Sequence, residues 1–250
     1  MHSFLLSIIT INYNNDKGLL KTIKSVTKQE FKDFEYIIID GNSNDFSKSI
    51  IEEYKTVISY SVSEKDNGIY HAMNKGIAKA SGKYLLFLNS GDELYNSKVL
   101  NNMSSYKTNI VYFNVSFYDS NHTFTHIYPS KLNFNYFLKY SLPHQATLIE
   151  RNLFNKVGLY DESLKICSDW AFFVDAIFKH SASYKKVEKV FSKLDRTGIS
   201  CDPKNKSWIE TERLNFLKTA YPQKNLNFVN ELSRMQKLKS ILKKFAKSFF

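Results

Sequence analysis

Short apolar runs alternate with helical patterns through the first hundred residues. Runs of strand length cover residues 5–11, 34–39, 57–62 and 83–88. Between them, apolar residues recur at three-to-four spacing and predict helices over residues 17–29, around residues 45–54 and over residues 68–80. Strands that alternate with helices build βαβ units. The pattern therefore predicts an α/β fold with a mostly parallel sheet flanked by helices.

Polar residues follow each of the four predicted strands. The strand ends read "TINYNN", "DGNSND", "SEKDNG" and "NSGDE". In open parallel sheets, ligands bind outside the carboxyl ends of the strands. Four polar strand ends at one edge therefore predict a binding site there.

The remaining chain has a less regular pattern. It predicts strands over residues 109–115, 143–149 and 185–194. It also predicts a short helix or turn over residues 134–140, a short helix that ends at residue 156, and a helix over residues 168–178. A helical pattern resumes at residue 207 and continues, with a break near Pro222, to the C-terminus. We expect one α/β domain over residues 1–200 and a basic helical extension over residues 201–250.

Positive charge is concentrated at the C-terminus. The net charge is +11, and residues 231–250 hold six Lys or Arg against one Glu. Their apolar residues recur at three-to-four spacing, as in a helix that lies on an anionic membrane surface. The alternative is a packed helix with a solvated basic face. No run reaches the roughly 18 apolar residues of a membrane span, and two cysteines without metal-ligand spacing fit a reducing compartment. These features predict a soluble cytoplasmic protein.

Four segments carry a family resemblance. They read "SIITINYNN", "IIIDGNSND", "SEKDNGIYHAMNKGIAKASGKYLLFLNSGDEL" and "PHQATLIERNLFNKVGLYDESLKICSDWAFF", and they span residues 7–173. In this order the chain resembles inverting family 2 glycosyltransferases of the GT-A fold, and most of all the bacterial members that build O-antigen or capsule repeat units. The resemblance implies a nucleotide-binding half over residues 1–100 and an acceptor half over residues 101–200.

The resemblance also implies a reaction. A hexose or N-acetylhexosamine would pass from a UDP-sugar to a lipid-diphosphate-linked saccharide, at the inner face of the bacterial cytoplasmic membrane. A divalent cation, Mn²⁺ or Mg²⁺, can stabilise the diphosphate leaving group, and by the resemblance Asp92 is its ligand. Members of the family often have two or three acidic residues in this motif. This chain has one, in Asn89-Ser90-Gly91-Asp92. The alternative for Asp92 is a solvated Gly-Asp turn.

The acceptor hydroxyl needs a general base, usually a carboxylate. By the resemblance the base is Asp169, which opens a predicted helix; capping of that helix by Ser168 or Asp169 is the competing interpretation. Trp170 could offer a flat face to a sugar ring or belong to the core. The resemblance places His144 of "PHQ" at the acceptor side of the cleft, and a core histidine is the alternative.

The resemblance assigns further residues to the donor. Asp40 would bind the uracil, with Thr10 and Tyr13 around the base; a turn in "DGNSND" explains Asp40 equally well. The remaining donor-side candidates are Asp66, Gly68 and Asn74. Lys75 could face the diphosphate or be a solvated helix lysine, and Arg196 could approach the diphosphate or a flexible loop, by its position alone. His71 stands where family members commonly have Asp, so it could alter donor contacts or be an exposed helix residue.

Other classes of function stay open from the sequence. A sugar nucleotidyltransferase usually has a glycine-rich loop after its first strand, and "TINYNNDKG" has no such cluster. A basic nucleic-acid-binding module would account for the charge, but no nucleic-acid motif is present, and we expect no nucleic-acid partner. A degenerate, inactive transferase is a further alternative, because the motif at residues 89–92 has one acidic residue where the family often has two or three.

Overall fold

The computed structural model describes residues 4–118, 122–195 and 198–223. The chain divides into two compact units after Pro203, near the predicted boundary at residue 200. Of the described elements, the first unit holds every strand and every α-helix except α7 (Lys206–Ala220), which belongs to the second. The predicted membrane-binding segment, residues 231–250, and Arg196 lie outside the described residues. Within the described ranges, no helix is long and apolar enough to cross a bilayer.

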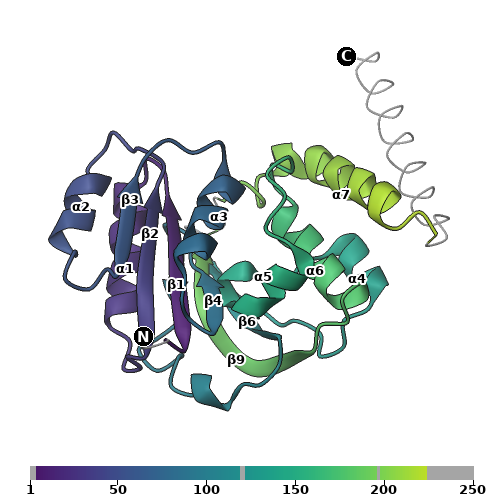
Figure 1. The fold of residues 1–250 in the computed structure, drawn as a ribbon, viewed down its shortest axis with the longest axis horizontal. Coiled ribbons are helices and arrows are strands. Elements are labelled where there is room, and N and C mark those ends of the chain that lie inside the picture. The colour runs from purple at the N-terminus through teal and green to yellow at the C-terminus, as the bar shows by residue number, and fades with distance from the viewer. Residues whose placement is uncertain (1–3, 119–121, 196–197, 224–250) are drawn as a thin grey trace. The chain divides into compact units, whose positions relative to one another are not determined.

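The first four strands form the predicted parallel arrangement, in the order β3-β2-β1-β4. The strands are β1 (Leu6–Asn12), β2 (Phe34–Asp40), β3 (Tyr60–Ser63) and β4 (Tyr84–Phe87). The connecting helices are α1 (Asp16–Thr27), α2 (Ser47–Glu53) and α3 (Ile69–Lys79). Helices cover both faces of the sheet (Figure 1), which explains why β1, β2 and β4 are almost wholly buried and apolar. The prediction of βαβ units is confirmed, although β3 is shorter than expected.

The sheet continues with mixed strand directions. Strand β8 (Thr147–Glu150) pairs antiparallel with β4 and with β6 (Ile110–Tyr118), and β6 pairs parallel with β9 (Tyr184–Asp195). Strand β5 (Glu93–Leu94) pairs antiparallel with β9, and strand β7 (Thr123–His126) pairs antiparallel with β6. The helices of this part are α4 (Phe134–Lys139), α5 (Arg151–Val157) and α6 (Ser168–Phe178).

One prediction about strands needs correction, and two strands were missed. Residues 143–149 are not one strand, because His144–Ala146 form a short 3₁₀ helix before β8 begins. Strands β5 and β7 were not predicted: the first has two residues, and the second is mostly exposed, so neither has a recognisable apolar pattern.

Close packing positions the helices against the strand ends. Helix α3 packs on β1 and β2, and a Cβ at Gly76 would lie 2.4 Å from the Ile9 side chain, so only glycine permits this approach. On the other part of the sheet, the Tyr160 ring contacts Phe87 of β4, Phe154 of α5 and Phe172 of α6, with centroids 5.4–5.5 Å apart. This aromatic cluster ties the start of α6 to the end of β4.

Candidate functional site

The loop after β4 places one buried carboxyl group at the strand ends. Asn89 and Asp92 close a turn through an N–H···O bond of 2.9 Å, and Gly91 between them has φ +105°, which favours glycine. Asp92 is 8% exposed. Burial raises the pKa of Asp92 to about 7, although the electrostatic effect of nearby His144 and a hydrogen bond from Gln145 act in the opposite direction. The Asp92 side chain is therefore not the solvated turn acid of the alternative interpretation.

A second buried carboxylate, Asp169, lies in the first turn of α6. Its Oδ2 atom is 2.8 Å from His144 Nδ1, and its Oδ1 atom is 3.0 Å from the Tyr70 hydroxyl. Burial alone would raise the pKa of Asp169, but the hydrogen bonds from His144, Tyr70 and the Trp170 N–H outweigh it and lower the pKa. The carboxylate is thus held in its ionised form, as a general base requires.

His144 connects the two acids. Its Nδ1 atom meets Asp169, and its Nε2 atom lies 3.2 Å from the Asn89 side-chain nitrogen in the loop that carries Asp92. A carboxylate only accepts and an amide nitrogen only donates, so these partners assign the hydrogen to Nδ1 and an acceptor role to Nε2. The two acids are therefore linked through one polar side chain. That His144 is a site residue stays a prediction.

A cavity of about 760 Å³ lies beside this chain of contacts, at the carboxyl ends of β1, β2 and β4. This volume is in the usual range for small-molecule sites. Three of the predicted residues line it: Tyr13, Asp66 and Gly68. The other lining residues are Ile11, Asn12, Asn15, Gly41, Asn42, Lys65, Ile69, Ala72, Asn89, Ser90 and Ile199.

One wall of the cavity combines an aromatic ring and a carboxylate. Tyr13 is 69% exposed. A Cβ at Gly41 would lie 3.1 Å from the Tyr13 ring and 3.4 Å from Asp66 Oδ2, so the ring and this oxygen approach the same point. The other oxygen, Oδ1, is bound by Lys75 at 2.7 Å and by His71 at 3.1 Å. His71 is therefore not a solvated helix residue: together with Lys75 it orients Asp66.

Four predicted ligand contacts are corrected because these side chains are buried and bonded within the fold. None of the four lines the cavity, and neither do Asp92, Asp169 and His144. Thr10 is fully buried and donates to the Leu88 carbonyl. Trp170 is 1% exposed and its indole donates to the Phe137 carbonyl, so no face is open to a sugar ring. These two are core residues.

The other two corrected residues bind neighbouring segments of the chain. The Asn74 amide donates to the Tyr160 carbonyl and to Glu162. Asp40 is fully buried, and its carboxylate accepts hydrogen bonds from Asn12, Ser43 and Ser63. Asp40 therefore holds the "DGNSND" turn under the cavity, and Asp66 is the carboxylate that reaches it.

Several site residues were not found from the sequence. Tyr70, Gln145 and Asp195 act on the two acids, and the charge of Asp195 adds to the raised pKa of Asp92. The register of the sheet explains this last contact: β5 pairs with β9, and Asp195 ends β9. No local pattern marks these residues, because each is far from its partner in the sequence.

The acid loop has the chemistry to hold a hard cation with help from a ligand. Among the described residues, no group of three or more His, Cys, Asp or Glu side chains could hold a metal ion. The side-chain oxygens of Asn89 and Ser90 are buried and have no hydrogen-bond partner in the described part of the chain. Mg²⁺ and similar ions prefer oxygen ligands and often use one carboxylate plus substrate phosphates. Asp92 with these two orphaned oxygens fits such an ion.

Comparison with known proteins gives consistent results. The model of glycosyl transferase family 2 matches residues 7–167. An uncharacterized glycosyltransferase of Rickettsia prowazekii is 34% identical over 185 residues, which are 68% of this chain and 58% of that protein. A PGL/p-HBAD biosynthesis glycosyltransferase of Mycobacterium bovis is 28% identical over 177 residues, 67% of this chain and 68% of that protein.

Solved structures confirm the predicted GT-A fold. TarS of S. aureus in complex with UDP-GlcNAc has a TM-score of 0.65 at 18% identity, over 88% of this chain and 74% of the TarS chain. A mannosyltransferase from Pyrobaculum calidifontis in complex with GDP-Man and Mn²⁺ has a TM-score of 0.59 at 13% identity, over 76% of this chain and 56% of that one. With the family match over most of its length, the chain belongs to glycosyl transferase family 2 and is a glycosyltransferase.

Proposed function

We propose that this glycosyltransferase is inverting and metal-assisted, and that it transfers a hexose or N-acetylhexosamine from a UDP-sugar to a lipid-diphosphate-linked saccharide of an O-antigen or capsule. The observation that carries the proposal is the chain of contacts Asp169–His144–Asn89 beside Asp92. It joins an ionised base to a cation-binding loop, which are the two groups that the reaction needs. That TarS was solved with UDP and with UDP-GlcNAc supports a nucleotide-sugar donor.

The nucleotide would occupy the cavity of about 760 Å³. Its base would stack on the exposed Tyr13 ring, and Asp66 Oδ2 would accept an N–H of the base. Lys75 and His71 hold Asp66 from the other side, so the carboxylate does not have to reorganise when the base arrives. The diphosphate would then point toward Ser90 and Asp92.

The transfer follows from the two acids. The acceptor hydroxyl approaches Asp169, which takes its proton as the new bond forms between the acceptor oxygen and the anomeric carbon. The bond from that carbon to the diphosphate oxygen breaks, and the nucleoside diphosphate leaves with the electron pair. Asp92 would hold a divalent cation, which would supply positive charge to stabilise this leaving group. Attack opposite the leaving group inverts the anomeric centre.

Other parts of the proposal concern the acceptor and the location. A lipid-linked acceptor requires access to a membrane surface, and residues 231–250, with a net charge of +5, have the composition of an interfacial helix. We place the enzyme at the inner face of the bacterial cytoplasmic membrane for this reason. This segment lies outside the described residues.

Two variants test the proposal. UDP should protect the native chain against thermal unfolding, and Mn²⁺ should strengthen the protection. Asp169→Asn should keep this protection and lower kcat by about 10²–10⁴-fold, the usual contribution of a general base. Asp92→Asn should instead lose the Mn²⁺-dependent part of the protection. Normal turnover by Asp169→Asn would refute the assignment of the base.

A further inference from the structure

The loop that carries Asp92 is bound along its whole length by helix α1. In family members with two or three acids, several side chains can share a cation, whereas here Asp92 is the one acid of the motif. A single carboxylate must already point in the right direction. The backbone contacts of the loop show how this direction is set.

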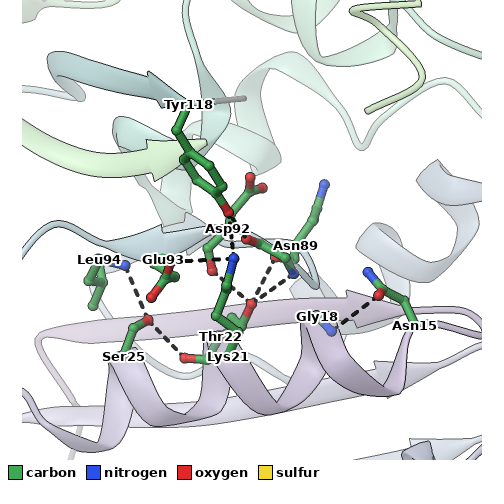
Figure 2. A network of polar contacts seen from close by, with 11 residues as sticks. Asn15, Gly18, Lys21, Thr22, Ser25, Asn89, Asp92, Glu93, Leu94 and Tyr118 are labelled. Atoms are coloured by element: carbon green, nitrogen blue, oxygen red, sulfur yellow. Dashed lines mark hydrogen bonds and ion pairs between the residues drawn. The ribbon is translucent and has the colours of Figure 1, made fainter. Parts of the chain in front are cut away.

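Thr22 makes three of these contacts. The residue is fully buried in the middle of α1. Its hydroxyl donates to the Asp92 carbonyl at 2.7 Å, lies 3.2 Å from the Asn89 carbonyl, and accepts the Gly91 N–H at 3.0 Å. One side chain therefore binds both ends and the centre of the turn, as Figure 2 shows.

Two other side chains complete the attachment. Asn15, the N-cap of α1, donates to the Ser90 carbonyl at 3.1 Å. On the opposite side, the Tyr118 hydroxyl lies 3.3 Å from the Gly91 carbonyl and receives a hydrogen bond from Lys21 at 2.8 Å. Each of the four loop residues thus has a backbone group bound by α1, its cap or β6.

These contacts bear on the site rather than on the general stability of the fold. One backbone bond joins the loop to a strand, from the Ser90 N–H to the Ile11 carbonyl of β1 at 3.2 Å. Gly91, which follows it, has a backbone conformation that only glycine adopts easily. Without the Thr22 hydroxyl, the Gly91 N–H would lose its acceptor and the turn could relax. The carboxyl of Asp92 and the buried, unpartnered oxygens of Asn89 and Ser90 are carried by this backbone and would move with it.

We infer that Thr22 is a positioning residue, whose hydroxyl holds the single-acid loop in the conformation that binds a nucleoside diphosphate with a divalent cation. The inference rests on the proposed function. It adds a residue of α1 that contacts neither the nucleotide nor the acceptor and acts through the backbone of Asn89, Gly91 and Asp92.

The test compares three variants of the full-length protein. Thr22→Val removes the hydroxyl at nearly constant volume, and Thr22→Ser keeps it. Ser25→Ala is the matched control: Ser25 is also on α1, but its hydroxyl accepts the Leu94 N–H at 3.1 Å, beyond the acid loop. The dissociation constant of UDP is measured by calorimetry with and without Mn²⁺, together with the thermal midpoint and steady-state kcat and KM.

Thr22→Val should weaken Mn²⁺-dependent UDP binding about tenfold, as expected for the loss of one to two net hydrogen bonds. KM for the donor should rise with it. Thr22→Ser should stay within about threefold of the native affinity, and Ser25→Ala should lower the thermal midpoint without changing the affinity. Native affinity in Thr22→Val, or an equal loss in Ser25→Ala, would overturn the inference.

Failure of the proposed function gives a different result. If the native chain did not bind UDP at all, the donor assignment would be wrong. Hydrogen exchange of the Gly91 amide still decides the role of Thr22, because it does not depend on a ligand. Exchange should accelerate in Thr22→Val and stay native in Ser25→Ala; unchanged exchange in Thr22→Val would refute the inference.

Discussion

His144 offers a way to separate two roles in one side chain, because its two nitrogens have different partners. Nδ1 binds Asp169 at 2.8 Å, and Nε2 meets Asn89 at 3.2 Å. An Asn side chain places its amide nitrogen, a donor, near the position of Nδ1, and a Gln side chain can place its amide oxygen, an acceptor, near that of Nε2. His144→Asn therefore keeps the bond to the base, and His144→Gln keeps the contact with the acid loop.

The magnitude follows from the contacts of Asp169. Burial would raise the pKa of this carboxyl, and the hydrogen bond from His144 is the largest of the effects that lower it. A hydrogen bond to a charged group contributes about 1.5–3 kcal/mol, so its loss in His144→Gln reduces the preference for the ionised form by roughly ten- to a hundredfold. A base whose pKa is lowered stays active as the pH falls. The acid limb of the rate profile should therefore move toward neutral pH in His144→Gln and change little in His144→Asn.

The assay is the pH dependence of kcat/KM for transfer, with thermal unfolding at each pH as the control for stability. The affinity for UDP should stay within about threefold of native in both variants, because His144 does not line the nucleotide cavity. The result that would contradict this reasoning is the same acid limb in the native chain and in His144→Gln. A shift of equal size in both variants would show that the ring, and not its Nδ1 hydrogen bond, is required.

Two further predictions concern the nucleotide half. Tyr13→Ala should weaken UDP binding about tenfold, since a base–aromatic stack contributes about 1–3 kcal/mol, while Tyr13→Phe keeps it; the ring is 69% exposed, so unfolding by urea should not change. Asp40→Ala should cost about 3 kcal/mol in the urea-measured free energy of unfolding at pH 7, because three side-chain donors lose their acceptor. Burial would raise the pKa of Asp40, but these donors lower it, so its stabilisation is present above the ordinary Asp pKa and is lost as pH falls through the lowered value. The difference in the free energy of unfolding between the native chain and Asp40→Ala should therefore become smaller below about pH 4. A difference that does not change with pH would show that the charge of Asp40 does not contribute.

The comparison of predicted and observed residues separates two kinds of site contact. Asp92, Asp169 and His144 were predicted from the family resemblance of their segments, and the structure places them in one group of polar side chains. Thr10 and Trp170 stand in equally recognisable motifs, yet their side chains point into the core. A motif identifies a segment of the site, but the side of the strand or helix that each side chain occupies depends on what packs against it.

The sequence by itself determined the alternation of strands and helices and the edge of the sheet at which the polar strand ends lie; the two acids that we propose for the reaction came from the family resemblance. The alternation and the polar strand ends are encoded locally, because a buried strand needs a continuous apolar run and its polar end must leave the core. Only the tertiary structure decided that Tyr70 and His144 bind Asp169, that Thr22 holds the loop of Asp92, and that Asp195 lies near it. Each of these contacts joins residues 25 or more positions apart. Such pairs form when strand register and helix packing bring distant segments together, and no short stretch of sequence records that arrangement.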